Sequence, residues 1–420
     1  AVTGQSTLSG LAFPTSDGSN GQVLQTNGSG TLSFATVSGG ASDINGLSDA
    51  KSGGTNFTNS IMVGDATTGT LNAAEGNTGL GIDIFAALTE GDDNVAIGYK
   101  AANALTTGTR NVFIGEEAGS IGTTTSYSVG IGRESLKNAT GDNNTGVGYV
   151  ALKGLTSGVR NTAVGRSAMA GTVTGDGNNA LGYAALIALT SGTNNVAIGE
   201  TALGANTTGN YNIAIGHEAL ALNTTASNNV AIGYKAVDAC TTGSELVGIG
   251  PKALGKATTA VSCIAIGDRA FEDLLDSPYN VAIGYKSGQN FEDGASNEGS
   301  CTFVGDSSGR SVTSGKQNTI IGAFAAYGNS YATTTGYRNT LVGASVHGNA
   351  ADSNSENVMG FDCRGVGNGY NTFGISSNRT YNQAGSASWS GSSDQRLKTD
   401  IVNEPLGLDF INDLRPVKFK

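Results

Sequence analysis

The chain has 420 residues, of which 65 are glycine and only 14% are charged, and its formal net charge is −11. Such a composition is unlike that of an ordinary globular enzyme. The negative charge and the lack of a Lys/Arg cluster argue against nucleic acid and anionic membrane surfaces as partners. No run of 18 apolar residues is present, so we predict no membrane insertion. The chain opens at Ala1, and we expect a mature or partial chain.

Residues 1–60 are predicted to form a β-rich N-terminal connector. Within them, residues 22–26 and 31–35 have strand-like sequences, and the Asn-Gly-Ser-Gly of residues 27–30 supplies a turn between them. This segment holds too little apolar material to fold alone. We therefore expect it to pack on the coil that follows or on neighbouring chains.

The middle of the chain, residues 61–374, repeats a short pattern whose clearest copy is Asn-Val-Ala-Ile-Gly at residues 94–98. The closing glycine, called the marker glycine here, recurs from Gly64 to Gly374 over 18 intervals, of which 14 equal the interval from Gly98 to Gly115. A register held this long, with a period of about 17 residues, is typical of a stacked repeat fold. Two short strands and two turns per repeat predict an all-β fold, a parallel β-solenoid or β-roll of about 18 coils.

Each coil has positions with distinct expected roles. Val95 and Ile97 share one face of a strand, which we take as the apolar interior, and Ala96 points to the other face. The interior is thin, so several chains side by side would bury more apolar surface. Small alanines on faces away from Val and Ile would be the contact surfaces, which favours an elongated homotrimer.

Polar positions of the repeat have structural explanations. The Asn that starts each copy, as at Asn94, is expected to form a hydrogen-bonded ladder from coil to coil; a calcium site is the rival, but the glycine-rich calcium nonapeptide is absent. Threonine pairs such as Thr207-Thr208 fit turn chemistry better than an ice-binding surface. Tyr99 and its equivalents after the marker glycine indicate a solvated outer face, with carbohydrate stacking as the alternative.

The chemistry-bearing residues are few. Cys240, Cys263, Cys301 and Cys363 lack CxxC spacing and are expected to be free thiols, so we predict no zinc site and no cofactor. Only His217 and His347 supply imidazoles, and no Ser/His/Asp set or paired-carboxylate cleft stands out. We therefore predict that the chain is not an enzyme acting on a separate substrate.

Two intervals are longer than the rest, from Gly284 to Gly305 and from Gly322 to Gly343, and are predicted to form loops on the solenoid. Loops on a rigid scaffold are where recognition is usually placed, although an insertion that is merely tolerated explains them equally well. Residues 375–392 are expected to form a distal tip or cap. The receptor-binding candidates are the aromatic residues of these regions: Phe291, Tyr327, Tyr331, Tyr337, Tyr370, Tyr381 and Trp389.

The Asn-x-Val/Ala-Ile-Gly-x-x-Ala repeats over residues 61–374 resemble the head repeats of trimeric autotransporter adhesins, and related coils occur in bacteriophage tail fibres. The resemblance implies a left-handed parallel β-roll assembled as a trimer. The adhesin coil is shorter than the repeat of this chain, so the resemblance leaves the handedness of this solenoid open.

A second resemblance lies at Ser393 to Ile401, with sequence SDQRLKTDI. This stretch is similar to the start of the intramolecular chaperone domain, peptidase S74, that ends phage tail spikes and fibres. The resemblance implies trimerisation followed by self-cleavage before Ser393, with Asp394 and Lys398 as candidate helpers. Residues 393–420 would be an incomplete start of that domain; an ordinary capped helix start is the alternative. Parts of residues 14–51 also look like connectors of marine phage tail fibres.

Together these features predict a structural and adhesive protein of the virion, located outside the cell. The expected function is that of a phage tail fibre that binds a host-cell surface glycan or protein through its distal loops. Its other partners would be copies of itself and virion tail proteins at the N-terminal end. A bacterial trimeric surface adhesin or filament subunit is the alternative, and a depolymerase resembling an endosialidase is a third.

Overall fold

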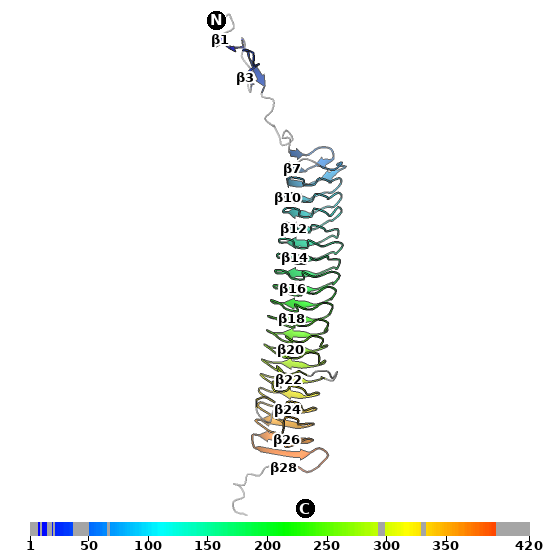
Figure 1. Cartoon of the computed structure of the whole chain (residues 1–420), viewed down its shortest axis with the longest axis vertical. Coiled ribbons are helices and arrows are strands. Elements are labelled where there is room, and N and C mark those ends of the chain that lie inside the picture. Colours follow the sequence, from blue (N-terminus) through cyan, green and yellow to red (C-terminus); the bar gives the residue numbers. More distant parts are fainter. Residues whose placement is uncertain are drawn as a thin grey trace, which may run out of the picture. The chain divides into compact units, whose positions relative to one another are not determined.

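The computed structural model describes residues 7–8, 11–14, 19, 22–36, 50–64, 68–292, 299–328 and 333–391. These residues form strands and turns, with no helix among them. The chain divides into two compact units, residues 1–177 and 178–420. Within each unit the strands are stacked one coil upon the next (Figure 1).

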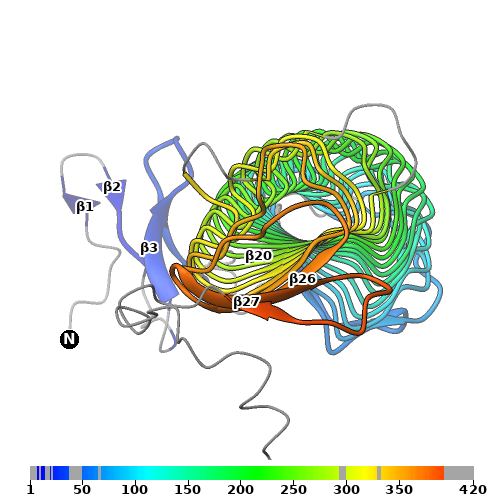
Figure 2. The same ribbon diagram turned by 90° about the horizontal axis from the view of Figure 1, so that it is seen from below.

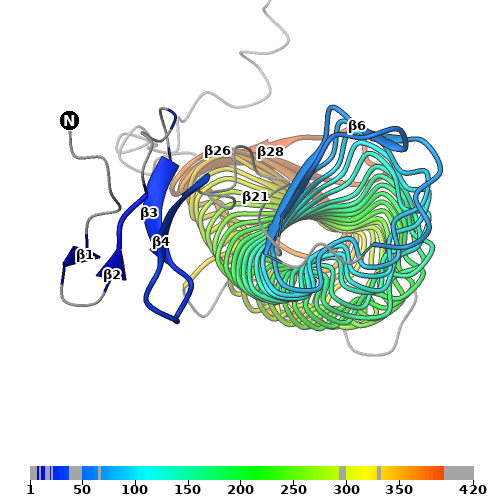
Figure 3. The same cartoon turned by 90° about the horizontal axis from the view of Figure 1, so that it is seen from above.

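The first unit begins with a short strand pair and a hairpin and continues as a solenoid. The hairpin predicted for residues 22–35 is confirmed, because β3 and β4 pair antiparallel with Gln22 opposite Thr36. Seen end-on, the successive coils of this unit repeat one outline (Figure 3). Its strands are β1 (Thr7–Leu8), β2 (Leu11–Ala12), β3 (Gln22–Thr26), β4 (Leu32–Thr36), β5 (Ala50–Ser52), β6 (Phe57–Thr58), β7 (Ile61–Gly64), β8 (Ala74–Glu75), β9 (Thr78–Gly81), β10 (Val95–Ile97), β11 (Val112–Ile114), β12 (Val129–Ile131), β13 (Thr145–Val147) and β14 (Thr162–Val164).

The second unit is itself a parallel stack of coils, and its strand direction reverses near its C-terminal end. β26, β27 and β28 pair antiparallel, and β26 and β27 lie across the last coil of this unit (Figure 2). Its strands are β15 (Asn179–Leu181), β16 (Val196–Ile198), β17 (Ile213–Ile215), β18 (Val230–Ile232), β19 (Val247–Ile249), β20 (Ile264–Ile266), β21 (Val281–Ile283), β22 (Thr302–Val304), β23 (Thr319–Ile321), β24 (Thr340–Val342), β25 (Asn357–Phe361), β26 (Tyr370–Ile375), β27 (Asn378–Gln383) and β28 (Ser390–Gly391).

The predicted all-β parallel solenoid of about 18 coils is confirmed, but the expectation of two strands in each coil was wrong. The coil that starts at Val95 has one strand of three residues, and its other half is a run of turns with left-handed backbone at Lys100 (φ 57°) and Ala102 (φ 50°). Regular strand pairing is lost at such residues. Coil-to-coil bonding persists, since the Ala102 N–H donates to the Ala118 carbonyl at 2.9 Å.

The predicted direction of the strand side chains was also wrong. Ala96 is fully buried inside its coil, whereas Val95 and Ile97 are only partly covered and face outward. The interior is too narrow for large side chains on both walls: a Cβ added at Gly248, in the same position as Ala96, would lie 2.4 Å from Val237. In most coils the strand therefore contributes a small residue to the core and the turn half contributes the large ones. Where the middle strand residue is large, as at Phe113 and Phe303, the turn half has a glycine beside it, Gly119 or Gly309. The alanines are not contact surfaces between chains.

The marker glycine is a site of close approach between the backbones of successive coils. Gly98 has a φ of 128°, and a Cβ there would lie 2.7 Å from the carbonyl of Gly115 in the next coil. Both the dihedral angle and the missing side chain are thus required. The glycine recurs because neighbouring coils come equally close at this position throughout the stack of each unit.

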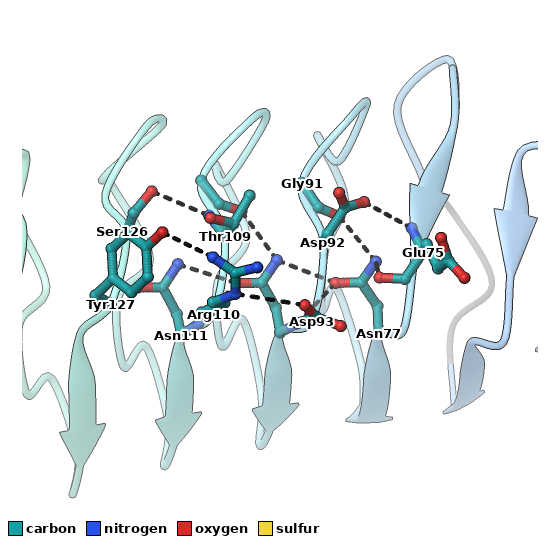
Figure 4. Close-up of polar contacts among 12 residues, drawn as sticks. Glu75, Asn77, Gly91, Asp92, Asp93, Thr109, Arg110, Asn111, Ser126 and Tyr127 are labelled. Carbon is teal, nitrogen blue, oxygen red and sulfur yellow. Dashed lines mark hydrogen bonds and ion pairs between the residues drawn. The ribbon is translucent and has the colours of Figure 1, made fainter.

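The predicted asparagine ladder is present in the core (Figure 4). The Asn94 side-chain amide donates to Asn77 Oδ1 at 3.0 Å and to the Gly108 carbonyl at 2.9 Å, and Asn111 donates in turn to Asn94 at 2.9 Å. These side chains are fully buried. Burial keeps water away from the backbone N–H and carbonyl groups of the turns. The asparagine side chains supply the hydrogen bonds that water would otherwise provide.

The ladder is interrupted where other residues occupy the Asn position, as at Ser128, Leu246, Cys263 and Cys301. The Cys301 thiol partly replaces the amide by donating to the Gly315 carbonyl at 3.2 Å. The four cysteines are free and buried, as predicted. Burial raises the pKa of Cys240 and of Cys263 to about 11, so both thiols stay protonated at neutral pH.

The threonine pairs also serve the turns, as predicted. Thr207 Oγ1 donates to the Thr224 carbonyl at 3.0 Å, and Thr224 Oγ1 donates to Thr241 in the same way at 3.1 Å. The hydroxyl of the first threonine in each pair thus donates a hydrogen bond to the next coil.

We expect Gly199→Ala to destabilise the second unit strongly. A Cβ at this residue would lie 2.4 Å from the Gly216 carbonyl oxygen, and its φ of 133° is unfavourable for alanine. The cost should be at least about 2 kcal/mol, measured by thermal unfolding followed with circular dichroism. Gly204→Ala is the matched control: its Cβ would meet nothing closer than 3.1 Å. Equal effects of the two changes would contradict this account.

Cys301→Asn should stabilise the same unit. Cys301 lies between Asn280 and Asn318 in the ladder, and its backbone N–H already donates to Asn280 Oδ1 at 2.9 Å. An amide at this position restores donation to Asn280 and to Gly315, at a gain of about 1 kcal/mol. Cys301→Ala, which removes the thiol donor, should lower the unfolding temperature. An unfolding temperature for Cys301→Asn at or below that of Cys301→Ala would exclude the ladder explanation.

Candidate functional surfaces

Tyrosines follow the marker glycine on the turn side of several coils. All are between 44% and 49% exposed, so the predicted solvated face is present. They are Tyr99 and Tyr149 in the first unit, and Tyr183, Tyr234 and Tyr285 in the second. Lys100 Nζ lies 5.0 Å from the centre of the Tyr99 ring, and Lys286 lies at the same distance from Tyr285. Such contacts orient the ring and the cation together.

A shallow cleft of about 250 Å³ crosses three consecutive coils of the second unit. It forms because Gly255 has no side chain, whereas the equivalent positions in the two flanking coils carry Asp238 and Glu272. The residues that line it are Tyr234, Lys235, Asp238, Lys252, Gly255, Lys256 and Glu272. Sequence reasoning missed this cleft, although the glycine between Asp238 and Glu272 at the same position of the repeat was visible.

The cleft mixes both signs of charge. Lys252 Nζ lies 3.7 Å from Glu272, while Lys235 pairs with Glu218 at 2.9 Å. Burial is the main cause that raises the pKa of Asp238 above its usual range. With the half-exposed Tyr234 ring at its edge, the cleft offers donors, acceptors and one aromatic surface. These groups match a hydroxyl-rich ligand better than a simple ion.

A second charged cluster lies on the first unit. The largely buried Glu134 accepts hydrogen bonds from Lys153 at 2.7 Å and from Lys137 at 3.2 Å, and Lys137 also pairs with Glu117. The hydrogen bond from Lys153, aided by Lys137, lowers the pKa of Glu134 to about 2 despite its burial. The cluster couples neighbouring coils through side chains that all have partners, which indicates a structural role.

The outward-facing side chains at the first and third positions of the strands are mostly Val and Ile and form an apolar ribbon along each unit. Thr or Asn occupies the first position in β9, β13 to β15 and β22 to β25. In the second unit, Ile198, Ile213 and Ile266 remain between 36% and 38% exposed. The strands are in register, with Val196 opposite Ile213 and Ile198 opposite Ile215. The alternation in the sequence had revealed this row, but it was assigned to the interior.

The predicted receptor-binding residues do not form one site in the described part of the chain. Phe291 was placed in a recognition loop, but it is fully buried among Phe271 and Phe303, with ring centres 5.7 Å from each. It is a core residue and cannot contact a receptor. Tyr337 is exposed, with the Arg338 guanidinium 5.7 Å from its ring centre. Tyr327 is half-buried beneath Arg310.

Three candidates lie on or beside the antiparallel strands that end the second unit. Tyr370 and Tyr381 are half-buried and contact each other, with ring centres 6.1 Å apart. Trp389 is exposed and contacts Phe373 at 5.6 Å. The other predicted residues, Tyr331, Ser393, Asp394 and Lys398, lie outside the described residues.

Comparison of the chain with family models, with curated proteins and with solved structures finds no match. Among the described residues, no group of three or more His, Cys, Asp or Glu side chains is placed to hold a metal ion. The same residues include no helix of the length and apolarity that a membrane span needs.

Acid should weaken the first unit through Glu134. The pKa of Glu134 is lower in the folded chain than its ordinary value of 4.5. Its contribution to the folding stability is therefore complete above pH 4.5 and declines as the pH falls toward 2. The contribution is no more than about 3 kcal/mol, because part of the network faces solvent. Glu134→Gln should therefore be less stable than the wild type at pH 7, and the difference should shrink at pH 3. Glu116→Gln, which alters the exposed pair with Arg133, is the control. A stability difference between the wild type and Glu134→Gln that is constant with pH would contradict the assignment.

Proposed function

We propose that this chain is a structural and adhesive fibre protein that assembles as a homotrimer and binds a host-cell surface, most simply as a phage tail fibre. The observation that carries the proposal is the apolar ribbon. An aliphatic strip repeated coil after coil is unusual on the surface of a soluble chain and marks an interaction surface.

A second copy of the same chain is the partner that best matches the ribbon. The ribbon repeats at the coil interval, so an identical ribbon presents apolar groups at the same spacing along its whole length. Covering the exposed third of one isoleucine contributes on the order of 0.5–1 kcal/mol. Many such side chains, summed over the coils, would hold copies together without any single strong contact.

The opposite, turn-side face is left to recognise other molecules. It carries the half-exposed tyrosines and the cleft at Gly255, where the groups suit a hydroxyl-rich ligand such as a cell-surface glycan. Three copies on one fibre would present every such site three times, so weak single contacts would add up to firm attachment.

The alternative remains a bacterial trimeric surface adhesin or filament subunit. The ribbon and the tyrosine face favour this reading as much as a tail fibre. The phage assignment rests on the sequence from Ser393 onward, and self-cleavage before Ser393 stays a prediction.

The mass of the native protein, measured by light scattering, tests the assembly. We expect three times the mass of one chain. Replacing both Ile198 and Ile266 by lysine should dissociate this assembly or lower its resistance to heating in detergent, since like charges from three chains would meet. Leu222→Lys is the matched control, because Leu222 is 55% exposed but lies on the turn side. A wild-type mass of one chain would exclude the proposed fibre.

A further inference from the structure

The apolar ribbon changes its composition over the last coils of the second unit. At the first strand position, the aliphatic residues of β16 to β21 give way to threonine in β22 to β24, and then to Asn357 and the aligned Asn371 in β25 and β26. The two asparagines are joined on the outer surface, since Asn357 Nδ2 donates to Asn371 Oδ1 at 2.7 Å. Asn371 donates in turn to Asn382 of β27 at 2.9 Å. One half of the ribbon thus becomes polar.

The other half becomes larger and more exposed. We define the terminal patch as Met359, Phe361, Phe373, Ile375 and Trp389. Met359 lies opposite Phe373 and Phe361 lies opposite Ile375 in the parallel register of β25 and β26, so the four side chains share one face. Trp389 extends this face through its contact with Phe373.

Three of these residues are more exposed than the ribbon. Met359 and Phe373, at the third strand position, are each 39% exposed, close to the 36–38% of Ile198, Ile213 and Ile266. Phe361 and Ile375, which directly follow marker glycines, are 58% and 63% exposed, and Trp389 is 55% exposed. None of the five residues is charged. The nearest cation on the adjoining strand, Arg379, is partly buried and donates to the Arg364 carbonyl at 2.6 Å. The patch therefore matches an apolar partner and offers no charged group to a ligand.

Position in the sheet indicates which apolar partner covers the patch. Met359 and Phe373 continue the row of third-position residues in unbroken register. Phe361 and Ile375 lie two residues further along the same strands and so on the same sheet face. Neighbouring copies that cover the ribbon would therefore reach the patch as well. After Val342, the row ends in two larger side chains, Met359 and then Phe373.

We propose that the terminal patches of three copies pack against one another. This contact, called the clamp here, keeps the three chains of the fibre from dissociating. This inference rests on the homotrimer proposed above and adds to it that stability is concentrated at β25 to β28 rather than spread evenly along the ribbon. Large aromatic side chains at the centre of an interface usually dominate its energy.

The sole tryptophan of the chain, Trp389, reports directly on this contact. In the native trimer its fluorescence should be blue-shifted and protected from acrylamide. In the dissociated Ile198→Lys/Ile266→Lys chain it should be red-shifted and quenched. Protection that persists in the dissociated chain would mean that the patch is covered from within one chain, and would overturn the clamp.

Matched double variants locate the stability. Phe361→Ser with Ile375→Ser should speed dissociation of the trimer in urea at least about tenfold more than Ile198→Ser with Ile215→Ser. Circular dichroism of each variant checks that the coils remain folded. Equal dissociation rates, or a native trimer with a fully quenched Trp389, would overturn the clamp while leaving the fibre intact. A monomeric wild type would instead reject the fibre itself.

Discussion

Successive coils approach so closely at the marker glycine that no side chain fits between their backbones. A Cβ at Gly98 or Gly199 would fall within 2.7 Å of a carbonyl group of the next coil, so the spacing is fixed by backbone contact. Every other repeated feature depends on that spacing. The buried asparagines reach one another only because each coil stands one strand spacing from the next, and the left-handed residues of the turn half keep their coil-to-coil bonds for the same reason.

The narrow interior has a direct effect on the outer surface. Because the turn half supplies Leu and other large residues to the core, the strand can place only small residues opposite them, such as Ala197 and Ala214. The two β-branched residues that make the strand are then left outside. A single chain thus buries most of its strand alanines and leaves outer isoleucines such as Ile198 and Ile213 partly exposed. This inversion is the physical reason for expecting other copies to complete the structure.

Much of the fold could be predicted from the sequence, because the constant period and the marker glycine reflect backbone contacts that recur unchanged. The Asn ladder followed from the same register. The direction of the strand could not be predicted, since Val-Ala-Ile alternates equally well with either face inward, and only the width of the coil decides between them. Phe291 was misplaced for a related reason. Its burial depends on space left by Gly288, where a Cβ would lie 2.5 Å from Phe271, and such long-range complementarity has no local signature. The cleft at Gly255 could not be predicted either, because its lining comes from three coils and no single repeat shows it.

Successive coils of the asparagine ladder form equivalent hydrogen bonds, so one coil can replace another. Asn195, Asn212 and Asn229 each accept a hydrogen bond from a backbone N–H of the next coil and donate one to a turn carbonyl of that coil. When one such coil is removed or duplicated, the two coils that become neighbours have hydrogen-bonding groups that already match. The gene can therefore change in length by whole repeats, through recombination between similar stretches, without a new folding problem at the junction. Adjusting the reach of the molecule is then a simpler evolutionary step than altering the residues at its end.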